Sequence, residues 1–504
     1  MLELKNISID LSVNNRKIAE NFSFILNQRD KAVIIGEEGN GKSTLLKLIY
    51  DERQVSDYCG YTGQIIRKGK LAYLPQFFPE EYLDYNVEQY FADTEPARHV
   101  RIFSRLGLSL DFTSSSQVVR TLSGGEKIKI QLAKILMSQP DILLLDEPTN
   151  DIDLETLDWL EGFINNCEQP LLYISHDETL IENTANIIIH MEQLVRKTKS
   201  KITVARGGYV DYVKARNLAY DKQTQVAKKQ RSDHKAQMER WQQIYNRVDH
   251  EQRNISKAGR DGEGRKLKKK MQSVKSTGKR LEHQADDFLD IPQIEQAILT
   301  QFDPKISIPH GKEILSLDLP ELCAGEKKLS GSIRLNVTGP RHVGIIGRNG
   351  AGKSTLLREI WAALKERADI TAAYMPQDYA EVLNYDRTAV GFLAADSDKE
   401  TITKARTFLG GMKFTQDEML GRIGRLSGGQ KAKILFLDMV LRNANVLILD
   451  EPTRNFSPLS APEIRKTLAL FNGAVISVSH DRKYLDEVCD VVYELTGEGV
   501  FVYR

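Results

Sequence analysis

The stretch KAVIIGEEGNGKSTLLKLI, residues 31–49, indicates the fold more clearly than any other part of the chain. Residues 31–35 form a short, mostly apolar run rich in β-branched side chains, which is typical of a buried parallel strand. The next residues have the spacing G-x-x-x-x-G-K-S, and the apolar residues after them have helical spacing. A strand, a glycine-rich loop and a helix in this order predict a site for the phosphates of a nucleotide.

The loop has the chemistry that phosphates require. Glycines let main-chain N–H groups close around phosphate oxygens, and the start of the following helix favours an anion. Lys42 is expected to reach the β- and γ-phosphates and Ser43 to bind Mg²⁺. We therefore predict an ATP-binding loop made of Gly36, Gly39, Gly41, Lys42, Ser43 and Thr44.

Four more polar clusters follow in the same half of the chain. A predicted strand ends at Gln76, and a predicted amphipathic helix opens with Ser123, Gly124 and Gly125, a pattern that fits either an anion site or an ordinary helix cap. The strand DILLLDEPT, residues 141–149, ends in two adjacent carboxylates, and the strand LLYISHD, residues 171–177, ends in a histidine.

The two carboxylates and the histidine have distinct predicted roles. Buried carboxylates at a strand end are costly unless they face a cation or a polar site. Asp146 suits Mg²⁺, and Glu147 suits a general base that polarises the attacking water. A single histidine is usually structural, but the position of His176 after the carboxylate strand predicts a contact with the γ-phosphate.

The same five motifs recur in the second half. Ser427, Asp450 and His480 each follow their first-half counterparts by 304 residues, and a constant offset indicates a tandem duplication. The candidate residues of the second copy are Gly347, Gly350, Gly352, Lys353, Ser354, Thr355, Gln377, Ser427, Gly428, Gly429, Asp450, Glu451 and His480.

Between the copies lies a strongly basic segment. Residues 214–285 contain 20 Lys and Arg against 8 Asp and Glu, a formal charge of +12 in a chain whose net charge is +1. Seven basic residues lie close together on one predicted helix. Such a cluster fits either a solvated surface or RNA binding. We favour binding to structured RNA, recognised through its phosphate backbone and its shape. These predicted RNA-binding residues are Lys266, Lys268, Lys269, Lys270, Lys275, Lys279 and Arg280.

The basic segment is predicted to form an antiparallel helical hairpin. Apolar residues form one helical stripe at Met238, Trp241, Tyr245, Val248 and Ile255. Three glycines within residues 256–264 are expected to break the helix. A second stripe follows at Leu267, Met271, Val274, Leu281, Ala285 and Phe288, with Gly278 as its one weak position.

Composition limits the class of protein. The 504 residues, 41% of them hydrophobic, are enough for about three domains. The four cysteines have no CxxC spacing, so we expect neither disulfides nor a zinc site. The N-terminus lacks the features of a signal peptide, and no apolar run reaches about 18 residues. We expect a soluble cytoplasmic protein with no membrane partner.

The five motifs, in this order, resemble the ATP-binding cassette (ABC) ATPases over nearly the whole of each half. The resemblance implies an α/β fold with two P-loop nucleotide-binding domains, each a RecA-like core with a helical subdomain, joined by the long antiparallel hairpin. It implies an ATPase that binds ATP and Mg²⁺ and produces ADP and phosphate. The expected boundaries are residues 1–213 and 300–504 for the two domains and 214–299 for the linker.

ABC modules work as head-to-tail pairs, so the resemblance implies a monomer with two composite sites. Site one would combine Lys42, Ser43, Gln76, Asp146, Glu147 and His176 with Ser427 and Gly429. Site two would combine Lys353, Ser354, Gln377, Asp450, Glu451 and His480 with Ser123 and Gly125. Magnesium would be held by Ser43, Gln76 and Asp146, and by Ser354, Gln377 and Asp450; the expected catalytic residues are Glu147, Glu451, His176 and His480.

The two sites differ in sequence. The first loop carries Glu37 and Glu38 where the second carries Arg348 and Asn349, and two extra carboxylates would weaken triphosphate binding unless they point to solvent. Ser457 replaces the aspartate that the first copy has after its carboxylate strand. Both general-base glutamates are present, so we expect both sites to hydrolyse ATP, at unequal rates.

The arrangement of the chain resembles the ABC-F family, with two cassettes joined by a basic hairpin linker and with no membrane segment expected. That family binds the ribosomal E site when ATP-closed, with its linker reaching toward the P-site tRNA and the peptidyl transferase centre. The expected partners are therefore the large ribosomal subunit, its ribosomal RNA and the P-site tRNA. Short spacing between Gln76 and Ser123 and a short tail after His480 resemble the bacterial antibiotic-resistance members, which protect ribosomes. A translation factor for stalled or idle ribosomes is the alternative, and a tandem ATPase subunit of an importer is a third.

Overall fold

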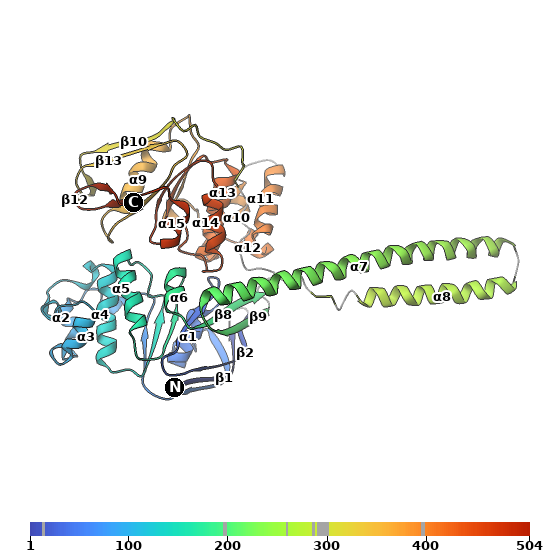
Figure 1. Cartoon of the computed structure of the whole chain (residues 1–504), viewed down its shortest axis with the longest axis horizontal. Coiled ribbons are helices and arrows are strands. Elements are labelled where there is room, and N and C mark those ends of the chain that lie inside the picture. Colours follow the sequence, from blue (N-terminus) through green and yellow to red (C-terminus); the bar gives the residue numbers. More distant parts are fainter. Residues whose placement is uncertain (13–15, 195–198, 259–260, 285–287, 290–301, 395–398) are drawn as a thin grey trace. The chain divides into compact units, whose positions relative to one another are not determined.

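The computed structural model describes the chain except residues 13–15, 195–198, 259–260, 285–287, 290–301 and 395–398, and it leaves out the side chains of residues 255–258 and 261–265. The chain divides into two compact units. One contains Met1–Tyr209 together with Glu295–Arg504, and the other contains Val210–Ile294. The first unit holds two copies of one α/β module, and the second is helical (Figure 1).

The first module is built on a six-stranded sheet with the order β5-β6-β7-β3-β8-β9. Its neighbours are parallel except for the antiparallel pair of β8 and β9. The strands are β3 (Lys31–Ile35), β5 (Leu71–Leu74), β6 (Ile142–Asp146), β7 (Leu171–Ile174), β8 (Ile187–Leu194) and β9 (Lys199–Arg206). A three-stranded antiparallel sheet has the order β2-β1-β4, from β1 (Leu2–Leu11), β2 (Arg16–Leu26) and β4 (Cys59–Arg67).

Helices connect the parallel strands of the first module, as crossover connections require. They are α1 (Lys42–Tyr50), α2 (Val87–Phe91), α3 (Val100–Arg105), α4 (Gly124–Met137), α5 (Leu154–Asn165) and α6 (Glu178–Thr184). Every residue of β3, β6 and β7 is buried, because helices cover both faces of such a sheet. The carboxyl ends of these three strands therefore share one edge, where ligands of open α/β sheets bind.

The second module repeats the first. Its large sheet has the order β15-β16-β17-β14-β18-β19, from β14 (His342–Ile346), β15 (Ala372–Met375), β16 (Val446–Asp450), β17 (Ala474–Val478), β18 (Val491–Leu495) and β19 (Val500–Val502). Two short antiparallel pairs precede it, β10 (Glu313–Leu319) with β13 (Ile333–Thr338) and β11 (Leu322–Ala324) with β12 (Lys327–Ser330). The helices are α9 (Lys353–Leu364), α10 (Ala389–Leu393), α11 (Lys399–Gly411), α12 (Gln416–Leu420), α13 (Gly428–Leu441), α14 (Ala461–Ala469) and α15 (Arg482–Val488). The predicted α/β fold with two P-loop modules is confirmed.

The helical unit consists of α7 (Tyr209–Ala258) and α8 (Asp261–Gln284), which lie side by side (Figure 1). The 50 residues of α7 span about 75 Å at about 1.5 Å per residue. Trp241 Nε1 donates to the Val274 carbonyl at 2.8 Å, and the His234 ring lies 2.9 Å from the Leu281 carbonyl. Trp241 comes after His234 in α7, whereas its partner Val274 comes before Leu281 in α8. The two helices are therefore antiparallel, as predicted.

The hairpin differs from the prediction at its turn. A break was expected over residues 256–264, but α7 continues to Ala258 and α8 begins at Asp261, so two of the three glycines lie in α8. A glycine inside a helix costs only about 1 kcal/mol, which the surrounding helix formers offset. The described residues do not include 259–260 or Ala285, and the side chain of Ile255 is not described. Phe288 lies beyond the end of α8, and its ring packs 5.1 Å from that of His234.

Gly278, the weak position of the predicted second stripe, makes room for Trp241. A Cβ at residue 278 would lie 2.6 and 2.8 Å from two carbons of the indole ring. Gly278→Ala is therefore expected to destabilise the hairpin by about 1–3 kcal/mol, because a rigid ring must move. Hydrogen exchange of the α8 amides in the full chain measures this effect as lost protection.

The matched control is the double variant Trp241→Leu/Gly278→Ala, in which the smaller side chain leaves space for the new methyl group. Protection should recover relative to Trp241→Leu alone. If Gly278→Ala instead raises protection on its own, by the roughly 1 kcal/mol that helix propensity alone supplies, the packing explanation is wrong.

Candidate nucleotide sites

The glycine-rich loops place a lysine ammonium at their centres. Lys42 Nζ donates to the carbonyls of Gly36 at 2.9 Å and Glu37 at 3.2 Å, and Lys353 Nζ makes the same two bonds in the second loop. Gly41, just before α1, has φ of 89°, a left-handed conformation that glycine adopts without strain. A buried cation among main-chain groups at a helix start is a suitable setting for phosphate.

Asp146, the last residue of β6, meets the predicted magnesium ligand of the loop. Ser43 Oγ donates to Asp146 Oδ1 at 2.9 Å. Tyr73 from β5 donates to Asp146 Oδ2 at 2.8 Å, a contact that the sequence did not reveal. Burial raises the pKa of Asp146, and these two hydroxyl groups partly oppose that shift. Gln76, the third predicted ligand, bonds to Glu147 instead.

Glu147 is held by three side chains. Gln76 Nε2 and Asn150 Nδ2 each donate to its Oε2 at 2.9 Å, and His176 Nε2 lies 3.1 Å from its Oε1. Burial alone raises the pKa of Glu147, but His176 and the Lys42 ammonium outweigh it and bring the pKa to about 2. The structure thus gathers the predicted glutamate, glutamine and histidine of site one.

The corresponding groups of site two are less tightly bonded. The main-chain N–H of His480 donates to Glu451 Oε2 at 3.3 Å, while Nε2 of the His480 ring lies 3.8 Å from Glu451 Oε1. Burial and the neighbouring Asp450 raise the pKa of Glu451 to about 8. Burial and the Lys353 ammonium lower the pKa of His480 to about 3. The two sites therefore differ in electrostatics although their motifs match.

Both predicted general bases have unusual backbones. The φ angles of Glu147 and Glu451 are 48° and 51°, in the left-handed region that side chains other than glycine rarely adopt. Such strain costs about 1–3 kcal/mol and persists only where the surrounding structure imposes it, often at functional sites. The same strain in both copies supports a shared functional role.

Site two opens into a cavity of about 860 Å³, a volume that suits a nucleotide. Its lining includes predicted residues of both modules: Ser123, Gly124, Gly350, Gly352, Lys353, Ser354, Thr355, Gln377, Asp450, Glu451 and His480. Among the described residues, Asp450 Oδ2, Glu451 Oε1 and His480 Nδ1 are buried without a hydrogen-bond partner. Orphaned oxygens beside the Ser354 hydroxyl fit a magnesium ion with its water and phosphate ligands.

Around site two, the loop of the second module contacts the first. The Asn349 N–H lies 3.4 Å from Asp153 Oδ2, and its side-chain amide donates to the Asp151 carbonyl. Arg348 pairs with Glu155 at 3.2 Å, and Arg454 pairs with Asp151 at 2.9 Å. The basic partner is contributed by the second module in each pair.

Around site one, the loop carboxylates of the first module contact the second. The Gly429 N–H donates to Glu38 Oε2 at 2.6 Å, and the hydroxyls of Ser457 and Ser460 donate to Glu37 Oε1. Neither glutamate therefore points simply to solvent. His176 Nδ1 lies 2.9 Å from the Phe456 carbonyl, which can only accept, so this nitrogen donates. The loop that contains Phe456 and Ser457 thus positions the His176 ring.

Ser123 and Ser427 are the capping residues at the starts of α4 and α13. Ser123 Oγ accepts from the Glu126 N–H at 3.2 Å while Glu126 reaches back to the Ser123 N–H, and Ser427 forms the same box with Gln430. The cap and an anion site are compatible. The serine side chain uses one of the four main-chain N–H groups that lack a partner within the helix, and the others can still donate to an anion.

The seven predicted RNA-binding residues of α8 are all exposed. Lys270 lies 3.9 Å from Glu251. Within the described ranges, no ion pair involves the other six: Lys266, Lys268, Lys269, Lys275, Lys279 and Arg280. With 20 Lys and Arg against 8 Asp and Glu over residues 214–285, this basic segment carries more positive charge than its own carboxylates can neutralise.

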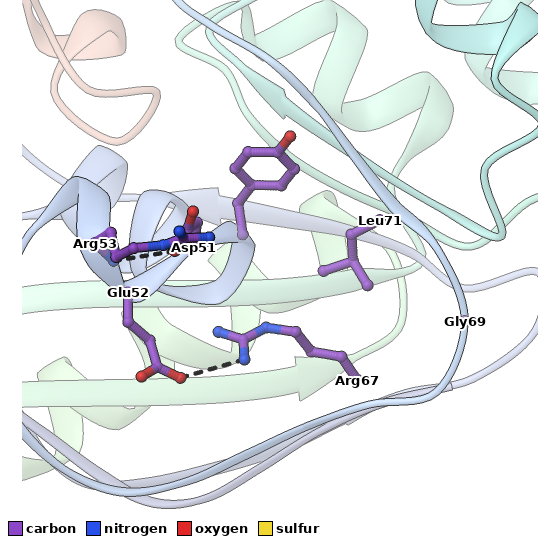
Figure 2. Close-up of a pocket in the computed structure, with 7 residues that line it drawn as sticks. Asp51, Glu52, Arg53, Arg67, Gly69 and Leu71 are labelled. Carbon is purple, nitrogen blue, oxygen red and sulfur yellow. Dashed lines mark hydrogen bonds and ion pairs between the residues drawn. The ribbon is translucent and has the colours of Figure 1, made fainter.

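A further cavity, of about 440 Å³, lies in the first module beside the end of α1 (Figure 2). Arg67 crosses it and donates to the carbonyls of Ile49 at 2.7 Å and Leu48 at 3.0 Å, and it pairs with Glu52. Arg53 pairs with Asp51 on the same wall. Arg67 thus satisfies two of the last carbonyls of α1, so the charged lining of the cavity has a structural role.

Comparisons with known proteins identify the family. The family model described as ABC transporter matches residues 19–150 and 331–454, together half of the chain. The chain therefore belongs to this family and carries its ATP-binding domain twice, which implies ATP binding and hydrolysis. In the part of the chain that the structure describes, no helix has both the length and the apolar character needed to cross a membrane.

The chain is similar to other ATP-binding proteins over most of its length. It is 26% identical to the putative ATP-binding protein YdiF of Bacillus subtilis, over 99% of this chain and 80% of that protein. It is 27% identical to a probable ATP-binding cassette sub-family F member 3 homolog of Encephalitozoon cuniculi, over 97% and 79%. The fold resembles an archaeal ribosome recycling factor, aABCE1, solved with the stalk protein aP1, with a TM-score of 0.58, 15% identity and coverage of 99% and 90%.

Proposed function

We propose that this chain is an ABC-F ATPase that binds the ribosome and protects its large subunit from antibiotics. One adenine nucleotide would bind in each composite site, and the basic hairpin would reach ribosomal RNA. The observation that carries this proposal is the exposed positive charge of α8, in a segment of formal charge +12 that lies between the two ATPase modules in the sequence. Uncompensated charge of this kind favours contact with phosphate backbones.

The residues of site two suggest how hydrolysis proceeds there. Lys353 and the main-chain N–H groups of its loop would bind the phosphates, and Ser354 and Asp450 would hold Mg²⁺. The ion, when bound, neutralises charge on the phosphates. Glu451 Oε1 has no hydrogen-bond partner and borders the cavity, so it is placed to take a proton from the attacking water. Its pKa of about 8 favours the protonated form, and the positive charge of a cation bound at Asp450 would lower that pKa and favour the carboxylate.

Site one has the same residues in a different state. Glu147 is the corresponding base, and its bonds to Gln76, Asn150 and His176 would have to loosen before it could receive a proton. We infer that the two sites turn over at unequal rates, with site two the faster.

The relatives support the choice of partner. One is named as a sub-family F member, and the structural relative is named as a ribosome recycling factor. By resemblance to ABC-F proteins, the chain would bind the E site with its linker, residues 214–299, directed to the P-site tRNA and peptidyl transferase centre. The flanking domains would be residues 1–213 and 300–504.

Ribosome sedimentation tests this proposal. The double variant Glu147→Gln/Glu451→Gln should hold ATP and pellet with ribosomes. Replacing four lysines of α8 by Gln in that background should weaken pelleting and reduce the slope of log affinity against log salt by up to about 3.6, because about 0.9 counterion is released per phosphate contact. The four residues are Lys266, Lys268, Lys269 and Lys270.

The control removes the same charge from exposed positions of the two modules, at Lys5, Lys68, Lys328 and Lys365. This variant should keep both its pelleting and its salt dependence. A double glutamate variant that stays in the supernatant with ATP would contradict ribosome binding. Growth with large-subunit antibiotics then separates the roles: unchanged drug sensitivity on deletion would exclude protection and favour a translation factor.

A further inference from the structure

The carboxylate of Glu38 occupies an anion-binding position at the start of α13. Its Oε2 accepts from the Gly429 N–H at 2.6 Å, across 391 residues of sequence. Gly429 is the second residue of α13, where main-chain N–H groups have no partner inside the helix. The short distance is typical of a charge-assisted hydrogen bond.

The carboxylate lies in close contact with the backbone at the start of α13. A Cβ at Gly428 would lie 2.9 Å from Glu38 Oε2, so the carboxylate rests against the backbone of the helix start. The neighbouring Glu37 is held by the hydroxyls of Ser457 and Ser460, both almost fully buried. Both carboxylates of the first loop are thus bound to the second module.

Site two has no such carboxylate. Asn349 takes the position of Glu38, and its amide donates to the Asp151 carbonyl. Ser123 and Gly124 at the start of α4 line the cavity together with Lys353. The anion that faces the helix start is therefore a side chain in site one, whereas in site two that helix start borders open space.

We propose that Glu38 makes site one select a nucleoside diphosphate over a triphosphate. The inference rests on the proposed binding of one nucleotide in each composite site. The Glu38 carboxylate takes the place at Gly429 that the terminal phosphate of ATP would take. A diphosphate ends nearer Lys42 and leaves this contact intact, so the modules stay joined around it.

A triphosphate faces two obstacles in site one. It must displace a carboxylate from a charge-assisted hydrogen bond, and it brings further negative charge close to Glu37 and Glu38. Like charges at short range inside a protein repel strongly because little water screens them. Neither obstacle applies to a diphosphate, which retains the lysine and the loop N–H groups as donors.

Equilibrium binding of fluorescent ADP and of a fluorescent, non-hydrolysable ATP analogue, both with Mg²⁺, tests the proposal. The full chain carries Lys353→Met so that site one dominates the signal. With Glu38 present, ADP should bind at least as tightly as the ATP analogue. Glu38→Asn should raise affinity for the ATP analogue at least tenfold and change ADP affinity less than twofold.

Two further variants separate charge from shape and from misfolding. Glu38→Gln keeps the side-chain length and should give the same gain as Glu38→Asn. The reverse exchange, Asn349→Glu in a Lys42→Met background, should lower affinity of site two for the ATP analogue at least tenfold and leave ADP unchanged. Unaltered melting temperatures would show that each variant is folded.

The outcomes distinguish this inference from the proposed function. A ratio of ATP to ADP affinity that is the same with Glu38, Gln and Asn overturns the role of Glu38 while leaving the ATPase intact. Failure of either nucleotide to bind any of the variants would overturn the nucleotide sites themselves. A loss of affinity for both nucleotides in Glu38→Gln would also contradict selection, since it would make Glu38 a general binding residue.

Discussion

Glu147→Gln/Glu451→Gln is expected to lower the ATPase rate of the full chain about 10²–10⁴-fold, the contribution typical of a positioned general base. Glutamine has nearly the same shape as glutamate but cannot accept a proton. ATP binding should survive because the phosphate contacts come from the loops of Lys42 and Lys353. Phosphate release under saturating ATP and equilibrium ATP binding measure the two effects.

The single variants should contribute unequally to this loss. Glu451 Oε1 is buried without a hydrogen-bond partner beside the site-two cavity, whereas Glu147 is hydrogen-bonded to three side chains. Glu451→Gln alone should therefore remove most of the activity, and Glu147→Gln should remove the smaller part. Equal losses would contradict the structural asymmetry, and a double variant with near-normal turnover would exclude both glutamates as bases.

Arg465→Met is expected to destabilise the second module and its junction with the first by about 3–5 kcal/mol, the usual cost of removing one partner from a buried ion pair. Arg465 lies in α14 with a side chain only 3% exposed. It pairs with Glu178 of the first module at 2.7 Å and with Glu487 of its own module at 2.8 Å. Its loss leaves the Glu178 carboxylate with less compensation.

Calorimetry of the full chain measures this effect as a fall of at least about 6 °C in the affected transition, at about 2 °C per kcal/mol for modules of this size. The control is Arg348→Met, which also pairs across the two modules, with Glu155, but with both side chains exposed, so its loss should matter less. Adding Glu178→Gln to Arg465→Met should restore part of the stability, because the unpaired charge is then removed. A fall no larger than that of the control would show that the pair contributes little.

Much of each module could be predicted because its signals are local. The apolar run before Gly36, the glycine spacing and the helical pattern after Ser43 all lie within twenty residues, and the structure forms the strand, loop and helix there. Repetition at a constant offset predicted the second module in the same way. The antiparallel hairpin followed from two apolar stripes, since helical periodicity is itself a local property.

Contacts between distant segments could not be predicted. Tyr73 reaches Asp146 because two parallel strands are neighbours in the sheet, and no motif marks that tyrosine. The Phe456 carbonyl that meets His176 is a backbone group, so side-chain identity carries no signal for it. In the sequence, Gly278 is the weak position of an apolar stripe, whereas in the structure it leaves room for the Trp241 ring.

By itself, the sequence determined two phosphate-binding modules and a basic hairpin, because strand, loop and helix patterns depend on neighbouring residues. It also showed that the first loop carries Glu37 and Glu38 where the second carries Arg348 and Asn349, but not where the two carboxylates point. Only the tertiary structure decided that the Glu38 carboxylate binds the Gly429 N–H, 391 residues away. The reason is physical: a hydrogen bond across two packed modules depends on how they fold against each other, which no local pattern encodes.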